Sequence, residues 1–336
     1  MATSPAAPAG RPSGRGAALA SAAARGTGWL SRRLRDPEAP LAAVEIRARS
    51  VGAVRMSRAG GRATLGAAAF LDLPEGVVKL SMTQPNIVDA EAFKQTLRAV
   101  LERAGILEGG RVALVLPDPV ARVALVPAAE VKGNRAQIEE LVRFRLRKAV
   151  PFEVREAHVA SVAGGARSGD PLMVGAIYRP VLEGYETACR ALGLYPGLVE
   201  LSGLALMTAA FAPRPAGDRL LVNWDEGYVS LILARGEWPI LVRTLTSEAV
   251  SSPEEVAREA GNTVLYYRER LGGPGLAEVL MRSAALPAAE AAAVLGNALE
   301  MVPEVVDPGT WLGPGMPMAG AQAIAGAAAS LAVRRA

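Results

Sequence analysis

Short runs of alternating apolar and polar residues open the part of the chain that can bury a core. Three runs of strand length, separated by small or glycine-containing turns, predict an antiparallel meander at residues 44–46, 51–56 and 63–70. A helix with an apolar face and then the buried strand 111–116 follow. The apolar residues of that helix are Phe93, Leu97, Val100, Leu101 and Ala104.

The second half of the chain repeats this order. Three further runs predict strands at 220–224, 228–234 and 240–245. Ser252 then marks a helix start, with a proline at the first helical position and a capping box, and Gly272 marks the helix end. After it we expect a strand at 278–281, a helix at 288–299 and a strand at 304–306. Two copies of strand–strand–strand–helix–strand predict a duplicated α/β fold.

A different pattern separates the two copies. Residues 129–200 predict two amphipathic helices and two strands, which we interpret as a small inserted α/β module. We therefore predict that residues 41–128, 201–218 and 308–336 form the first half of the duplicated fold. Residues 219–307 then form the second half.

The excess of positive charge is confined to the N-terminus. Residues 1–40 hold six Arg against one Asp and one Glu, a net of +4, which equals the net charge of all 336 residues. This tail has almost no large apolar residue, so we predict that it is disordered, and it lacks the continuous apolar stretch of an export signal. The uncharged run 308–333 contains Pro314 and Pro317 and predicts a closing buried helix rather than a membrane span.

Few residue types suited to catalysis are present. One cysteine and one histidine exclude a disulfide framework and a zinc cluster, and suggest an intracellular, soluble chain. None of the four lysines stands in a Walker A frame, and neither G-x-S-x-G nor G-x-G-x-x-G after a strand occurs. We interpret His158 as a strand residue that faces water or a neighbouring side chain, and Cys189 as a small buried apolar group. We therefore expect neither a catalytic residue nor a metal site.

The turn after the first strand of each meander is the better candidate site. Glu45, Arg47 and Ser50 lie at the first turn, and Asn223 and Asp225 at the second. In a duplicated fold of this kind, two glycine-rich turns would hold the phosphates of a nucleotide between the halves. Here a side chain as large as Arg47 blocks close approach of the backbone, and adjacent carboxylates at the second turn repel phosphate unless a divalent ion intervenes.

Several stretches, taken in order, resemble the PilM family, the actin-like, FtsA-related proteins of type IV pilus assembly. The resemblance covers roughly residues 41–336. The stretches are Val44–Arg55, Leu73–Val78, Val112–Asp118, Ile138–Glu153, Val174–Leu194, Val264–Tyr267 and Val305–Pro308.

The resemblance implies an actin-like, RNase H-like fold with a first subdomain 1A, the insert as subdomain 1C, and a second half formed by 2A and 2B. It implies a cytoplasmic scaffold, peripheral at the inner membrane, that binds the N-terminal tail of a PilN-like bitopic membrane protein and links it to the pilus motor ATPases. Self-association is a further expectation, and binding to nucleic acid is not expected. The partner tail is expected in the groove between the insert and subdomain 1A.

The family binds ATP with magnesium between its two halves, and this chain departs from the family there. Glu45 stands at the family's first Asp and Arg47 at its first Gly, while Asn223 replaces its second Asp and Asp225 the matching Gly. The residues from Arg282 to Leu286 replace a late Gly-Gly pair. The departures imply that nucleotide binding is weakened or lost and that the protein is not an ATPase.

Other interpretations stay open at this point. The chain can be an ATP-gated switch of the same machine, a GspL-like component of a type II secretion platform, or an unassigned α/β binding protein. Arg143 and Arg147, on the outer face of the insert's first helix, are candidates for contact with an acidic partner. A solvated charged face explains them equally well.

Overall fold

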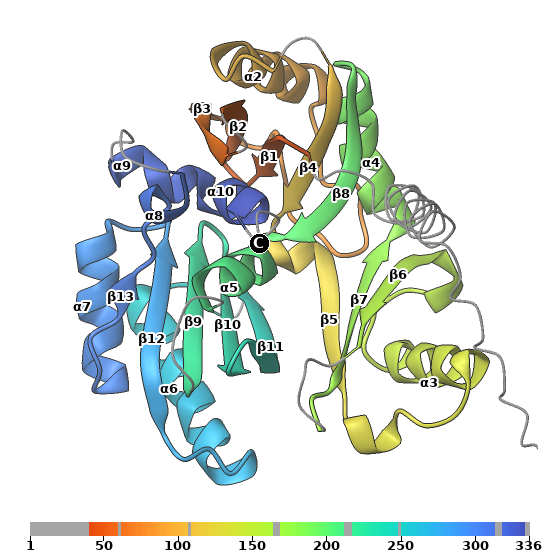
Figure 1. Ribbon diagram of the computed structural model, residues 1–336, viewed down its shortest axis with the longest axis vertical. Coiled ribbons are helices and arrows are strands. Elements are labelled where there is room, and N and C mark those ends of the chain that lie inside the picture. The colour runs from red at the N-terminus through yellow and green to blue at the C-terminus, as the bar shows by residue number, and fades with distance from the viewer. Residues whose placement is uncertain are drawn as a thin grey trace, which may run out of the picture. The chain divides into compact units, whose positions relative to one another are not determined.

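The computed structural model describes residues 40–59, 62–106, 109–163, 169–211, 217–247, 250–312 and 318–332. Figure 1 shows the arrangement of these elements. The tail predicted to be disordered, residues 1–40, lies outside the described residues except for its last position.

The first half is built on a five-stranded sheet with the order β3-β2-β1-β4-β8. Three antiparallel strands form the predicted meander, and β1–β4 and β4–β8 pair in parallel. Helix α2 packs its predicted apolar face on this sheet and begins at Asp89, whose side chain accepts two backbone N–H groups. The elements are β1 (Ala42–Ile46), β2 (Ser50–Ala59), β3 (Arg62–Asp72), α2 (Ala90–Arg103), β4 (Gly110–Leu116) and β8 (Leu194–Leu201).

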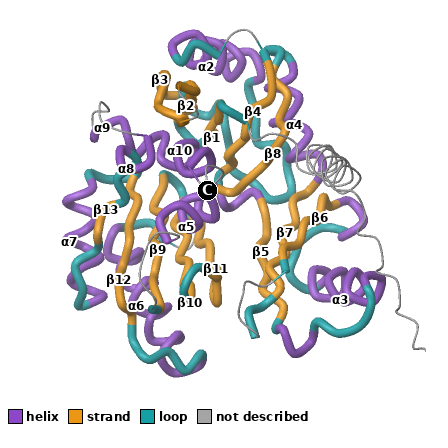
Figure 2. Tube along the Cα trace, in the orientation of Figure 1, coloured by secondary structure: helices purple, strands orange, loops and turns teal. Residues whose placement is uncertain are grey.

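The second half repeats the design with a sheet of order β11-β10-β9-β12-β13. Its meander is again antiparallel, and a helix leads to the parallel strand β12 beside β9. The repeat confirms the predicted duplicated α/β fold, and the two sheets can be compared in Figure 2. The elements are β9 (Asp218–Asp225), β10 (Tyr228–Arg235), β11 (Trp238–Thr246), α6 (Pro253–Arg270), β12 (Leu276–Ser283), α7 (Ala288–Leu299) and β13 (Glu304–Val305).

The insert is a three-stranded antiparallel sheet with the order β5-β7-β6, covered by helix α3. Helix α3 opens with a capping box between Asn134 and Gln137. The elements are η1 (Asp118–Val120), β5 (Ala121–Val126), η2 (Ala128–Glu130), α3 (Arg135–Arg147), η3 (Val154–Glu156), β6 (Ala157–Val162) and β7 (Leu172–Tyr178).

The predicted limits of the insert, residues 129–200, need correction at both ends. Strand β5 pairs with β7 and not with the first sheet, so the insert begins at η1. At the other end, helix α4 (Arg179–Arg190) packs Val181, Tyr185 and Cys189 into the core of the first half, and β8 pairs with β4. Local apolar periodicity marks a strand, but it does not say which sheet that strand joins.

Helices α5 and α10 pack against each other near the junction of the two halves. Helix α10 contributes Ala325 and Ala329 to an apolar cluster with the second sheet, and Ala327 and Leu331 to one with the first sheet. The predicted closing buried helix is therefore confirmed, and none of the described helices is long and apolar enough to cross a membrane. The remaining helices are α5 (Ser202–Phe211), α8 (Gly309–Leu312), α9 (Met318–Ala321), η4 (Gln322–Ile324) and α10 (Ala325–Ala332).

The close approach of this C-terminal segment to β2 can be tested at Gly52. A Cβ atom at position 52 would lie 2.6 Å from Ile324 Cγ2 and 3.3 Å from the carbonyl oxygen of Ala323. We expect Gly52→Ala to lower the free energy of unfolding by about 1–3 kcal/mol, measured by urea denaturation. The control is Gly184→Ala in α4, where an added Cβ meets nothing within 4 Å and should cause no loss. Equal stability of both variants would contradict the packing.

Candidate functional site

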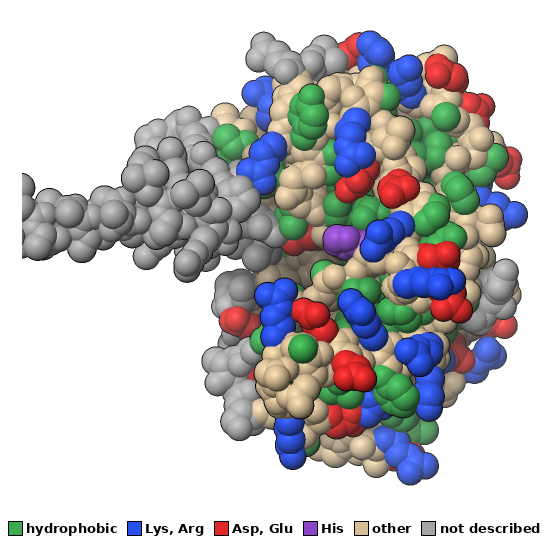
Figure 3. All heavy atoms as spheres, turned by 90° about the vertical axis from the view of Figure 1, so that its right-hand side faces the viewer, with side chains coloured by type: hydrophobic (Ala, Val, Ile, Leu, Met, Phe, Trp, Pro, Cys, Tyr) green, Lys and Arg blue, Asp and Glu red, His purple; other side chains and the backbone are tan. Residues whose placement is uncertain are grey.

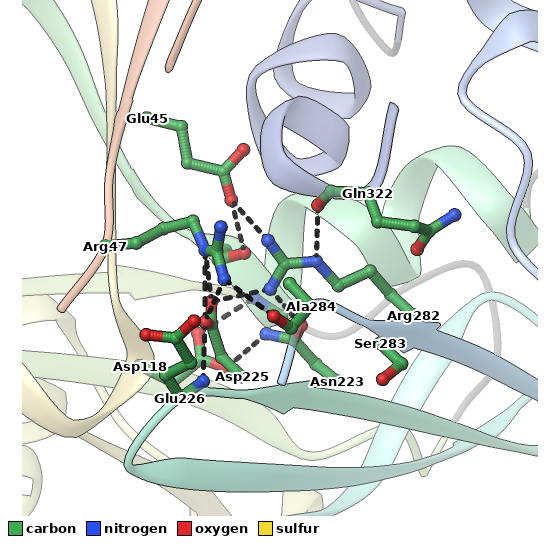
Figure 4. A network of polar contacts seen from close by, with 12 residues as sticks. Glu45, Arg47, Asp118, Asn223, Asp225, Glu226, Arg282, Ser283, Ala284 and Gln322 are labelled. Carbon is green, nitrogen blue, oxygen red and sulfur yellow. Dashed lines mark hydrogen bonds and ion pairs between the residues drawn. The ribbon is translucent and has the colours of Figure 1, made fainter. Parts of the chain in front are cut away.

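The residues predicted at the two turns come together in one buried network between the halves (Figure 4). Glu45 belongs to β1, and Arg47 follows this strand, while Asn223 and Asp225 belong to β9, the equivalent strand of the second half. All four side chains are buried, and Ser50, at the start of β2, is buried as well. The structure thus confirms that these five positions form one cluster. Whether the cluster binds a nucleotide is a separate question.

Arg47 and Asp225 join the two halves directly. Arg47 Nε lies 3.0 Å from each carboxylate oxygen of Asp225, and Nη2 lies 2.7 Å from Oδ1. The remaining donors of Arg47 reach the Ser50 hydroxyl at 2.9 Å and the carbonyl oxygen of Ala284 at 3.3 Å. This is the forked arrangement of a guanidinium on a carboxylate, which is the strongest ion-pair geometry available to side chains.

A second guanidinium, that of Arg282 on β12, approaches Asp225 from another side. Arg282 Nη1 lies 2.6 Å from Asp225 Oδ2 and 3.1 Å from Asn223 Oδ1, and Nε donates to the carbonyl oxygen of Gln322 at 2.9 Å. Its contact with Glu45 is longer, at 3.4 Å. Arg282 has no exposed surface, so each of its donors depends on a protein acceptor.

Glu45 ties the network to the C-terminal helix. Its Oε2 accepts the backbone N–H of Ala327 at 2.9 Å, and Oε1 accepts the hydroxyl of Ser202 at 3.2 Å. A Cβ atom at position 326 would stand 2.6 Å from Glu45 Oε1. Glycine at 326 is therefore what lets the helix backbone reach the carboxylate.

Asp118 ties the same network to the insert. It lies in η1, directly before β5, and its Oδ1 accepts the backbone N–H of Gly203 at 2.8 Å. Its Oδ2 accepts the side-chain amide of Asn223 at 3.0 Å. One buried cluster therefore contacts both sheets, the C-terminal helix and the beginning of the insert.

The charges of this cluster are nearly balanced. Arg47 and Arg282 face three carboxylates, so one negative charge is in excess when every group is ionised. Burial disfavours charge on Asp225, but Arg282 and Arg47 outweigh it and hold the pKa of Asp225 well below its usual range. Burial raises the pKa of both Glu45 and Asp118. A proton on one of these two carboxyls neutralises the cluster.

This arrangement leaves little for a polyphosphate to bind. Both guanidinium groups are already paired with Asp225, and the carboxylates would repel a phosphate placed among them. Within the described ranges, no group of three or more His, Cys, Asp or Glu side chains could hold a metal ion. The observed role of these side chains is to hold the two halves together by buried ion pairs and hydrogen bonds.

Two members of the network, Arg282 and Asp118, were not identified as site residues from the sequence. Arg282 directly follows the buried strand residues Val279, Leu280 and Met281, and a charged residue in such a position requires a buried partner. This pattern could have identified Arg282 from the sequence. The partner itself is 57 positions away in the chain, and no local pattern indicates it.

A second feature is a groove with a volume of about 1470 Å³ between the insert and both halves. From the insert, alternate residues of β6 line it, namely His158, Ala160 and Val162, together with residues of β5 and β7. The groove therefore lies over one face of the insert sheet. From β8, the consecutive residues 196–201 all line it, so it follows the free edge of that strand.

The groove has an acidic lining and an aromatic wall. Its acidic residues are Asp170, Glu183, Glu186, Glu200 and Glu237. Its three arginines are all engaged: Arg179 with the carbonyl oxygen of Ala157, Arg219 with Glu278 and Arg235 with Asp218. The wall on the side of the second half carries Trp238 and Pro239.

The other residues considered from the sequence lie elsewhere or have structural roles. Arg143 and Arg147 are exposed on α3, as predicted, but they do not line the groove, and their contact with a partner stays a prediction. Exposed side chains of both charge signs cover this side of the molecule (Figure 3). Burial raises the pKa of Cys189 to about 12, which suits a packing role and not a nucleophile.

We expect a substitution of Asp225, at the centre of the network, to lower the stability of the protein strongly. Asp225→Asn leaves Arg47 and Arg282 buried without their shared carboxylate, and we expect the free energy of unfolding to fall by about 3–5 kcal/mol in urea denaturation. The control is Glu259→Gln, which breaks the half-exposed pair with Arg243 and should cost about 0–1 kcal/mol. Equal losses would contradict the central place of Asp225.

The network also predicts a pH dependence. Because the native pKa of Glu45 is raised above 4.5, its stabilising contribution is complete below that value and is lost as the pH rises through the native pKa. Above pH 4.5, the wild type should therefore lose free energy of unfolding relative to Glu45→Gln as the pH rises. Urea denaturation of both proteins across this range measures the difference. A difference that grows in favour of the wild type with pH would contradict the assignment.

Comparison with known proteins supports the fold. No protein-family model matches the chain, and no curated protein matches it by sequence. The chain is similar to the solved PilM–PilN type IV pilus biogenesis complex, with 21% identity, a TM-score of 0.69, and coverage of 89% of this chain and 99% of that chain. At this identity the likeness shows the fold alone, and it confirms the actin-like fold.

Two more distant structures have TM-scores below 0.5. The cytoplasmic domain of EpsL, an inner-membrane component of the type II secretion system of Vibrio cholerae, has 12% identity over 73% of this chain and 82% of that chain, with a TM-score of 0.45. A protein of unknown function with an actin-like ATPase fold from Bacteroides thetaiotaomicron has 7% identity over 79% and 90%, with a TM-score of 0.49.

Proposed function

We propose that this protein is a docking scaffold of a type IV pilus assembly platform, and that its groove holds an extended segment of a partner protein. The proposal rests on the groove, which combines a strand edge, an apolar floor and an acidic lining. The fold likeness to the PilM–PilN complex supports a PilN-like bitopic membrane protein as the partner. Binding that partner would place the protein at the inner membrane and within reach of the pilus motor ATPases.

The free edge of β8 favours an extended partner. Its outer backbone groups are not paired with another strand among the described residues, and six consecutive positions of this strand line the groove. A peptide that adds a strand here gains main-chain hydrogen bonds, while its alternate side chains rest on the apolar floor formed by Val123, Met173 and Ile177. This geometry suits a short linear segment better than a folded domain.

The charge of the groove favours a basic segment. Cytoplasmic segments next to a membrane span are rich in Lys and Arg, which an acidic groove attracts. Glu183 and Glu237 line the groove and have no ion-pair partner among the described residues, so they are available to such a segment. The N-terminal cytoplasmic tail of a bitopic membrane protein therefore fits in both shape and charge.

Binding of the partner segment in the groove can be tested by substitution of Gly175. This residue of β7 lines the groove, its neighbour Val174 is buried in the insert, and an added Cβ meets nothing within 4 Å. We expect the synthetic N-terminal tail of the PilN-like protein of the same genome to bind the wild type in fluorescence anisotropy. Gly175→Leu should remove binding by filling the groove.

The matched control is Gly184→Leu on α4, which also meets open space but does not line the groove, and should bind as the wild type does. Undiminished binding by Gly175→Leu would place the partner elsewhere. No binding of the tail to the wild type would overturn the proposed function.

A nucleotide is not part of the proposed function. Titration calorimetry with ATP and magnesium should show no heat of binding, because Asp225 already occupies both arginines of the site. Micromolar binding would instead support an ATP-gated switch of the same fold.

A further inference from the structure

The buried network joins the two halves through side chains of the protein itself. Its charged members come from β1 and the following turn in the first half, from η1 at the start of the insert, and from β9 and β12 in the second half. Asp225 receives both guanidinium groups, so each of the shortest contacts of the cluster has one end on this carboxylate. The Arg47 contact crosses between the halves, whereas the Arg282 contact lies within the second half.

Separation of the halves would break the pair that crosses them. Arg47 keeps only 6% of its surface exposed and Asp225 only 1%. If the halves part, Arg47 loses its carboxylate, Glu45 loses its contact with Arg282, and Asp118 loses Asn223. Charges that are buried as pairs are costly to leave unpaired, so these contacts oppose opening until water solvates the groups.

The network and one contact outside it both connect the halves to the docking groove. Asp118 opens η1, which directly precedes β5, and Ala121 and Val123 of β5 form part of the groove floor. On the other side, Trp238 of the second half donates its indole N–H to the carbonyl oxygen of Pro171, at the start of the insert's β7, at 2.8 Å. The wall that carries Trp238 therefore faces the floor only while the halves stay together.

We infer that Arg47, Asp225 and Arg282 replace a bound ligand as the device that holds the halves closed, and that they thereby keep the docking groove in its binding shape. Arg47 and Asp225 are positioning residues in this scheme, since neither lines the groove. Docking is then constitutive and does not depend on the nucleotide state of the cleft. The closure rests on the network alone, whereas its effect on docking rests on the proposed function.

Hydrogen exchange of the full chain tests the closure without any peptide. We compare the wild type with Arg47→Met, which keeps an unbranched stem and removes the charged guanidinium group. Exchange should become faster at residues 225–230, 236–240 and 171–177. The control is Arg243→Met, which removes the pair with Glu259 inside the second half and should change exchange only near that pair.

The wild type alone gives a second measurement that does not depend on a variant folding. Its exchange at residues 45–52 and 225–230 should be slow and should not change when ATP and magnesium are added. Protection that appears only with ATP would overturn the inference, because the ligand would then be closing the halves. Unchanged exchange at 236–240 and 171–177 in a folded Arg47→Met protein would overturn it as well.

Peptide binding separates the two proposals. Arg47→Met should weaken binding of the PilN-like tail by about tenfold, within the range of ordinary coupling between sites, while Arg243→Met should not. If the wild type binds the tail and Arg47→Met binds it equally well, the link to the groove fails and the proposed function stands. If the tail does not bind but exchange responds as expected, the proposed function fails and the closure stands.

Discussion

The arrangement of the molecule centres on one carboxylate, that of Asp225, which is buried between the guanidinium groups of Arg47 and Arg282. Arg47 belongs to the first half of a duplicated fold, while Asp225 and Arg282 belong to the second. An ionised carboxylate is stable in such a position only with cationic partners of good geometry, and both are present. The relative placement of the two halves is thus fixed by electrostatics at the point where their first strands end.

Apolar packing around this centre occurs both within each half and between the halves. Each half has a separate apolar core. The C-terminal helix α10 packs on both sheets and also offers its backbone to Glu45. Non-directional packing brings the halves together, and directional ion pairs select one orientation for them.

The groove depends on this orientation, since it has walls from three parts of the molecule. The floor comes from the insert, one side from the edge of β8, and the opposite side from the hairpin that carries Trp238. An extended, basic segment matches that combination of shape and charge. The cleft between the halves, in contrast, is filled by the protein's own side chains. The two features therefore differ in kind, since one is a buried set of ion pairs and the other is an open groove.

The duplicated fold could be predicted from the sequence because its signals are local. Period-two runs, the helix start at Ser252 and the glycine at its end each depend on residues close in the chain. The large or charged side chains at the two turns indicated poor phosphate binding, and the resemblance to the PilM family implied departures at positions 45, 47, 223 and 225.

The sequence alone could not determine the partners of these residues. It indicated that carboxylates at the second turn would repel phosphate, but not that Arg47, 178 positions away, neutralises Asp225. It also assigned residues 121–126 to the first half, whereas they form β5 of the insert sheet, because an isolated strand pattern does not specify a pairing partner. Local structure is set by neighbours along the chain, whereas buried charge pairs and sheet membership are set by neighbours in space. The tertiary structure therefore decided that the cleft is filled and where the groove lies.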